Sequence, residues 1–208
     1  MRNYLKLAII LSVMVIFTNC KNEPQLSDYI YSEKEFQVTC ENIDLDLIKE
    51  AVYSFEEDIT NYFSPKENKN LLQAYPRAVN FLINGRGKFN KIASPHTQEI
   101  FEILKTDIEL WNLDGETKSL NYDHELVKCI ANSLTDKDLK TTFNALITTN
   151  SMSAKLFGEP LRRKAFLAAK DKNLSTYIAL DMYYAKLFDV DFDKETSNKE
   201  PLEPKNLK

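Results

Sequence analysis

The feature that most constrains this chain is a helical spacing of apolar residues over 43–63. These residues recur at intervals of three and four: Leu45, Ile48, Val52, Phe55, Ile59 and Tyr62. Asp44 and Asp46 stand at the start, where the helix dipole favours anions. Only 4 Gly occur in the chain, which disfavours folds rich in tight turns or phosphate-binding loops. The sequence predicts an all-α fold, an irregular bundle of about six or seven helices after an extended N-terminal tether.

Two Ser-Pro pairs predict the next helix starts. Ser64-Pro65 with Glu67 forms a capping box, and that helix is expected to kink or split at Pro76 and to stop at Asn84-Gly85. Ser94-Pro95 starts another helix, whose apolar stripe continues to Trp111 and ends near Asp114-Gly115. The Asn-Gly and Asp-Gly pairs are also typical of hairpin turns, but the apolar period favours helix ends.

Four later segments also show helical patterns, namely 122–133, 136–149, 160–170 and 173–188. We therefore predict a single helical domain over 43–188. A lipidated cysteine, tether and extended arm are expected over 20–42. Residues 189–208 lose the helical pattern and contain prolines and many charges, which is typical of a disordered acidic and polar tail.

The first residues have the order of a secretion signal. Arg2 and Lys6 precede an apolar run over 7–17, which is too short to span a bilayer, and Cys20 follows it. This segment resembles the lipobox signal of bacterial lipoproteins. The resemblance implies that residues 1–19 are removed and that Cys20 is acylated, for example with palmitate, and anchors the chain in a lipid bilayer. The alternative is a conventional secretory signal with a chance cysteine.

In that family an Asp directly after the cysteine resembles an inner-membrane retention signal, whereas here Lys21 follows. The resemblance therefore favours the outer membrane of the cell envelope and leaves open whether the domain faces the periplasm or the outside. The formal net charge is −4, and loss of residues 1–19 removes two cations and no acid. Lysines alternate with acids along the chain, so we expect no nucleic-acid binding.

Two further cysteines, Cys40 and Cys129, are separated by most of the predicted domain. Outside the cytoplasm they are able to form a disulfide, which would stabilise the fold by closing a long loop. The alternative, which we favour, is two buried thiols that pack as small hydrophobic side chains.

Asp181 interrupts an apolar helical stripe formed by Leu174, Ile178, Ala185 and Phe188. A carboxylate on a core face must find partners or change its pKa. The candidate partners are Arg162, Arg163, Tyr177 and Tyr184. The functional interpretation is a polar group in a pocket between helices, and the alternative, which we favour, is a structural hydrogen-bond network or a helix with Asp181 at its edge.

Two patterns suggest metal sites. Asp189, Asp191, Asp193 and Glu200 have the spacing of calcium ligands in a helix-loop-helix loop, but Lys194 replaces the glycine of the turn, and a solvated acidic tail explains them equally well. His124-Glu125 resembles the start of a zinc-protease helix, yet Lys128 stands where the second His is required, so we expect His124 in the first turn of a helix. No cofactor is expected, with calcium as the alternative.

Signatures of common nucleophilic and phosphoryl-transfer enzymes are absent from the sequence. The leading hypothesis is therefore a membrane-anchored, non-enzymatic helical module that binds another envelope protein or serves assembly. The alternative is a lipoprotein that binds a small ligand near Asp181 or calcium in the acidic segment 189–200. An enzyme with an unfamiliar carboxylate site is a third, less favoured hypothesis.

Overall fold

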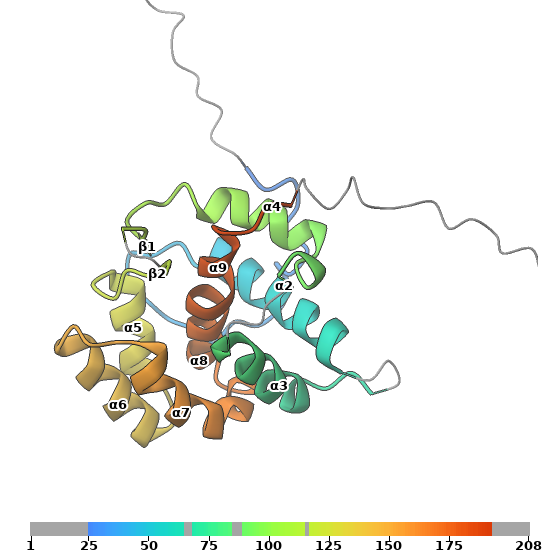
Figure 1. Ribbon diagram of the computed structural model, residues 1–208. Coiled ribbons are helices and arrows are strands. Elements are labelled where there is room, and N and C mark those ends of the chain that lie inside the picture. The colour runs from blue at the N-terminus through green and yellow to red at the C-terminus, as the bar shows by residue number, and fades with distance from the viewer. Residues whose placement is uncertain (1–24, 65–67, 85–88, 115–116, 193–208) are drawn as a thin grey trace, which may run out of the picture.

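The computed structural model describes residues 25–64, 68–84, 89–114 and 117–192 (Figure 1). The predicted all-α fold is confirmed. The described part contains seven helices when the continuous helix 172–187 is counted as one, and a small two-stranded sheet.

The helices are α2 (Asp46–Phe63), α3 (Leu71–Ile83), α4 (Pro95–Leu104), α5 (Glu125–Ser133), α6 (Lys137–Thr148) and α7 (Ala154–Lys164). Short 3-10 turns cover Phe89–Lys91 and Ala165–Ala169. The C-terminal helix consists of α8 (Lys172–Tyr177), a π-helical segment (Ile178–Tyr184) and α9 (Ala185–Leu187). The strands are β1 (Trp111–Asn112) and β2 (Ser119–Leu120).

The C-terminal helix lies in the centre of the molecule. In Figure 1, α5, α6 and α7 lie on one side of this helix and α2 and α3 on the other. α4 crosses near its C-terminal end, α9. All residues over 173–185 are buried. The sequence indicated one apolar stripe on this helix, but it is buried on every face, as is typical of a helix at the centre of a bundle.

The strands that flank Asp114-Gly115 in the sequence pair as an antiparallel hairpin, so the interpretation of this pair as a helix end was wrong. α4 ends at Leu104, and Trp111 pairs with Leu120 across the antiparallel strands. The Asp107 carboxylate accepts hydrogen bonds from the amides of Glu109 and Leu110, both at 3.2 Å. Such bonds from a side chain to the backbone compete with helix continuation. The Trp111 side chain is buried and donates to the Leu104 carbonyl at 2.8 Å.

Most helix starts have a polar cap. The side chains of Asn70, Ser94, His124, Asp136, Ser153 and Asp171 each accept a hydrogen bond from an amide in the first turn that follows. The predicted start at Ser94 is therefore found. α3 instead begins after Asn70 and continues through Pro76 without a break, and α7 begins at Ala154 with Pro160 inside it.

α2 carries three buried carboxylates. Glu50 accepts the amides of Ile30 and Tyr31 at 2.8 and 3.0 Å, and it lies 2.7 Å from the His96 ring nitrogen Nε2. These contacts fix the N-terminal segment and α4 to α2.

The other two acids of α2 face the central helix. Glu56 accepts the Lys172 ammonium at 2.7 Å and also the Ser175 hydroxyl. Asp58 accepts the amide of Ser94, the Thr97 hydroxyl at 2.6 Å and the Tyr183 hydroxyl at 2.8 Å. Burial raises the pKa of the Asp58 carboxyl above its ordinary value, and these hydrogen bonds oppose the rise.

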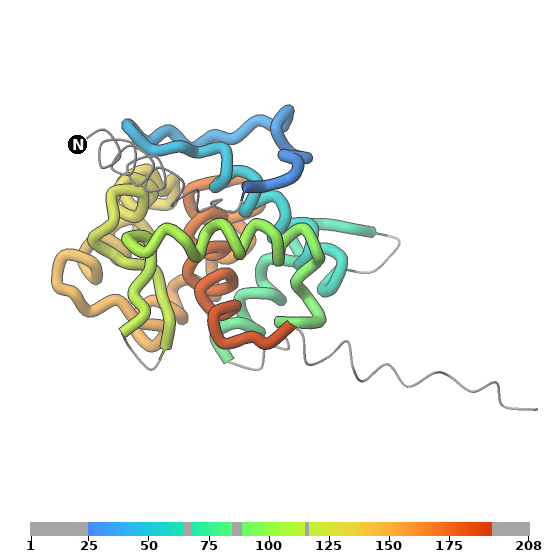
Figure 2. Tube along the Cα trace, turned by 90° about the horizontal axis from the view of Figure 1, so that it is seen from above, coloured from blue at the N-terminus to red at the C-terminus, as the bar shows by residue number. Residues whose placement is uncertain are grey.

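An N-terminal arm over 25–45, without regular helix or strand, lies along the outside of the bundle (Figure 2). The Tyr53 hydroxyl of α2 donates to the Glu35 carbonyl, and Lys49 donates to the Ser32 carbonyl at 2.8 Å. Cys40 of the arm forms a disulfide with Cys129 of α5. The expectation of two free, buried thiols was therefore wrong. The arm places the Cα atom of Cys40 5.8 Å from that of Cys129, close enough for the disulfide.

The disulfide is expected to contribute strongly to stability, because it closes a loop with a sequence separation of 89 residues. The Cys40→Ser, Cys129→Ser double variant should lower the free energy of unfolding by about 4 kcal/mol in urea unfolding. Reduced wild-type protein should fall to the same value, and reductant should leave the double variant unchanged. An unfolding midpoint that reductant does not move in the wild type would contradict this pairing.

Candidate functional site

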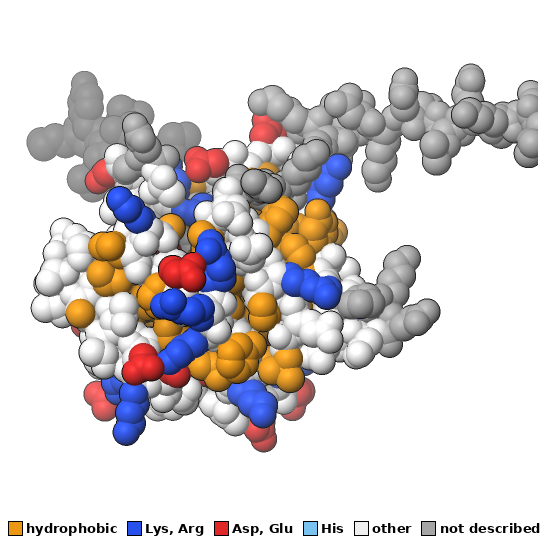
Figure 3. Space-filling view, turned by 60° about the horizontal axis from the view of Figure 1, so that its bottom comes forward, with side chains coloured by type: hydrophobic (Ala, Val, Ile, Leu, Met, Phe, Trp, Pro, Cys, Tyr) orange, Lys and Arg blue, Asp and Glu red, His pale blue; other side chains and the backbone are white. Residues whose placement is uncertain are grey.

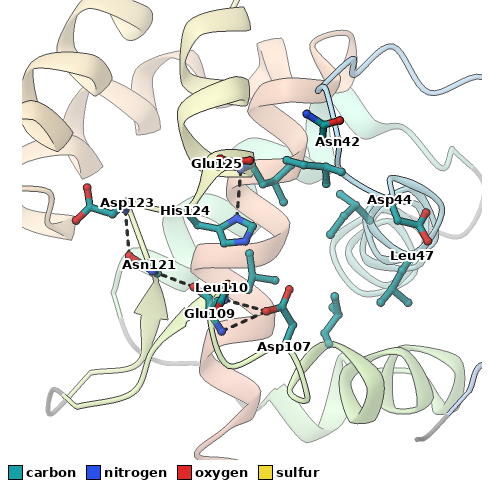
Figure 4. Close-up of a pocket in the computed structure, with 14 residues that line it drawn as sticks. Asn42, Asp44, Leu47, Asp107, Glu109, Leu110, Asn121, Asp123, His124 and Glu125 are labelled. Atoms are coloured by element: carbon teal, nitrogen blue, oxygen red, sulfur yellow. Dashed lines mark hydrogen bonds between the residues drawn. The ribbon is translucent and has the colours of Figure 1, made fainter.

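A hollow of about 640 Å³ opens between the arm, α2, the end of α4 and the start of α5 (Figure 4). Its floor is apolar and is formed by Ile43, Leu47, Ile48, Leu104, Leu110 and Leu126. Its charged groups are all acidic, namely Asp44, Asp107, Glu109, Asp123 and Glu125. No Lys or Arg is among the lining residues, so the hollow, which we call the acidic hollow, has a strongly negative rim.

Hydrogen bonds between side chains and the backbone position this rim. Asn121 accepts the Asp123 amide at 3.0 Å and donates to the Glu109 carbonyl at 2.9 Å, which ties the two sides of the hairpin base together. His124 caps α5 through Nδ1, which accepts the Leu126 amide at 3.2 Å. His124 is thus the N-cap residue and not part of the first turn as predicted. Figure 4 shows Asp44 and Leu47 on the opposite side of the hollow from Asp123 and His124.

The rim carboxylates are mostly without cationic partners. Asp123 lies 3.5 Å from the Lys128 ammonium, and both side chains are exposed. Asp44, Glu109 and Glu125 form no ion pair within the described part of the chain. Among the described residues, no group of three or more His, Cys, Asp or Glu side chains is placed to hold a metal ion. The hollow therefore presents dispersed negative charge over an apolar floor.

Asp181 lies in a second cavity, of about 380 Å³, between the central helix, the β1–β2 hairpin, the end of α3 and α7. It is 8% exposed and lies in the π-helical segment, a rare helix form that is frequent at functional sites. Its Oδ1 accepts the Leu120 amide at 2.9 Å and the Tyr122 hydroxyl at 3.0 Å. Burial raises the Asp181 pKa, while these donors, Lys186 and the Tyr177 hydroxyl lower it.

The predicted partners of Asp181 are only partly those found. Tyr177 lines the same cavity. Tyr184 instead donates to the Ala51 carbonyl of α2 at 3.2 Å, and Arg162 pairs with Glu159 at 2.8 Å on the surface of α7. The other partners, Leu120 and Tyr122, lie in the hairpin and directly after it. The sequence did not indicate them, because they are distant from Asp181 along the chain. The sequence signal that could have indicated these partners is the Asp114-Gly115 pair, if it is interpreted as a hairpin turn.

The acidic segment after the central helix is only partly described. Asp189 and Asp191 lie there, and the side chains of Val190 and Phe192 pack on the core. Asp193 and Glu200, the other two candidate calcium ligands, lie outside the described residues, as does Cys20. The proposed calcium loop and the lipidation site therefore stay predictions.

A third surface is apolar but mixed. Leu72, Leu156 and Phe166 are exposed on α3, α7 and the 3-10 turn after it. Figure 3 shows hydrophobic patches on the face at the bottom of Figure 1, broken up by Lys, Arg, Asp and Glu side chains. Charges of both signs are mixed on this face, whereas the charged side chains of the acidic hollow are all negative.

Comparisons of the chain with models of protein families, with curated proteins and with solved structures find no match. Within the described ranges, no helix is both long enough and apolar enough to cross a bilayer.

Proposed function

We propose that this chain is a lipid-anchored protein of the bacterial cell envelope that binds a partner protein through the acidic hollow. The observation that carries the proposal is the combination of an apolar floor with a rim whose charges are all negative. Protein interfaces commonly join a desolvated apolar centre to a polar rim. The hollow offers both parts on one surface.

The rim selects the partner by charge. A group of carboxylates raises the local concentration of cationic groups and speeds their association, and it repels acidic surfaces. Among the apolar lining residues, the half-buried side chains of Ile43 and Leu47 offer an apolar contact below the rim. We therefore propose a partner segment that carries Lys or Arg beside an apolar side chain.

The proposed anchor holds the start of the described domain near a membrane. Cys20 precedes the first described residue, Gln25, by five positions, and a chain of that length spans at most about 18 Å. Acylation of Cys20, which the lipobox resemblance implies, holds the domain at the surface without a membrane-spanning helix. Partners in the same membrane then meet the domain at a high effective concentration.

Replacement of the anchor tests the first half of the proposal. The Cys20→Ala variant should move from the membrane fraction to the soluble fraction, because acyl chains supply about 0.8 kcal/mol per buried methylene and the variant has none. Fractionation and immunoblotting measure this, with Cys40→Ser, Cys129→Ser as the control for general cysteine effects. A Cys20→Ala protein that stays in the membrane fraction contradicts lipid anchoring.

Charge reversal tests the second half. Glu109 and Glu125 line the hollow, and neither side chain forms a hydrogen bond or ion pair within the described residues. Native envelopes are mildly cross-linked, and the partner is captured and quantified by mass spectrometry. With the double variant Glu109→Lys, Glu125→Lys, the amount of partner recovered should fall at least about tenfold. The matched control is Glu33→Lys, Asp114→Lys, which changes the charge equally at exposed positions outside the hollow.

The proposal also predicts how the captured interaction responds to salt. Its yield should fall as ionic strength rises, because surface charges are screened beyond about 8–10 Å in physiological salt. Equal recovery of the partner by the hollow variant and the wild type would contradict binding at this site. Recovery of the protein alone from wild-type envelopes would contradict a protein partner altogether.

A further inference from the structure

The cavity beside Asp181 is a second site, independent of the acidic hollow. Its apolar walls come from three elements, α3 with Ile83, α7 with Phe157 and Leu161, and the central helix with Met182. The volume of about 380 Å³ lies in the range of small-molecule sites. The cavity is therefore suited to the apolar body of a small ligand.

Methionine gathers in this cavity. The chain has 4 methionines, and after the predicted signal segment only Met152 and Met182 remain. Both line the cavity. Unbranched, polarizable side chains adapt to ligands of different shape, which is why methionine is frequent on adaptable binding surfaces. The walls are able to close around an aliphatic chain without a fixed shape.

One cationic side chain lines the cavity. Lys186 lies on its wall, and its ammonium donates to the Lys118 carbonyl at 2.6 Å. No carboxylate of the described residues lies within ion-pair distance of it. An ammonium has three donors, so further donors are available to a ligand. Burial lowers the Lys186 pKa, and the nearby charges of Asp181 and Asp189 oppose this.

Asp181 is already engaged by the protein. The Leu120 amide and the Tyr122 hydroxyl both donate to its Oδ1, and the Tyr177 hydroxyl stabilises its charged form. These neutral donors hold the carboxylate against the hairpin and satisfy it there. Its role in the cavity is to position the hairpin wall, and Lys186 is the group left to recognise a charged ligand.

We propose that this cavity binds a small aliphatic carboxylate, with the carboxylate on Lys186 and the aliphatic chain between Met152, Met182 and Phe157. A single ammonium matches a monoanion. A phosphate dianion usually draws on several cationic or amide donors, and here the second charged group of the wall is the carboxylate of Asp181.

Methionine methyl NMR of the purified full chain tests this proposal. The probes are decanoate, decanol and decylammonium, each added below its micelle concentration. Decanoate should shift the methyl signals of Met152 and Met182, which both line the cavity. Decanol should bind at least about tenfold more weakly, because it lacks the charge that pairs with Lys186.

Three variants separate recognition from folding. Lys186→Leu should lose at least about tenfold of the decanoate affinity and bind decanol as the wild type does, whereas Lys186→Arg should keep decanoate binding. Lys137→Leu, at an exposed position of α6 outside the cavity, is the matched control and should behave as wild type. Thermal unfolding of each variant checks that it is folded.

Several results would overturn the proposal. These are the absence of decanoate-induced shifts at Met152 and Met182, equal binding of decanoate by Lys186→Leu, and tighter binding of decylammonium than of decanoate. The last result would assign recognition to Asp181. None of these outcomes bears on the acidic hollow, whose test uses Glu109 and Glu125.

Discussion

The fold depends on three carboxylates of α2 that are buried together with the groups that compensate them. Glu50, Glu56 and Asp58 each accept hydrogen bonds from segments that α2 contacts in space but not in sequence. An uncompensated buried charge costs several kcal/mol, so each acid stabilises only the arrangement that brings its donors to it. These acids fix the arm, the start of α4 and the central helix to one another.

Both sites inherit their geometry from this arrangement. The arm and the turn after α4 form two walls of the acidic hollow, and Glu50 and Asp58 hold the arm and the start of α4 on α2. The second cavity depends on the same principle, because Asp181 of the central helix holds the hairpin through the Leu120 amide. Buried acids here position walls, while exposed acids and one lysine are left to meet partners.

The sequence predicted the fold class and a helix over 43–63, which the structure contains over 46–63, because apolar spacing is local information. It did not indicate that Glu56 and Asp58 are buried, although Glu56 follows the apolar residue Phe55 and Asp58 precedes the apolar residue Ile59. Asp181 was recognised by that same criterion. The hairpin and its bonds to Asp181 join residues about 60 positions apart, and a periodic pattern carries no information on such pairs. The acidic hollow was missed because its residues come from three separate stretches of the chain, 42–48, 104–110 and 121–126.

Native-state hydrogen exchange tests the central role of the buried carboxylates most directly. The amides of Ile30, Tyr31 and Ser94 lie in segments without regular helix or strand, and they donate to Glu50 and Asp58. The account predicts that they exchange only through global unfolding, with the same protection as the core amides of α2. Exchange of these amides as fast as that of exposed loop amides would contradict it.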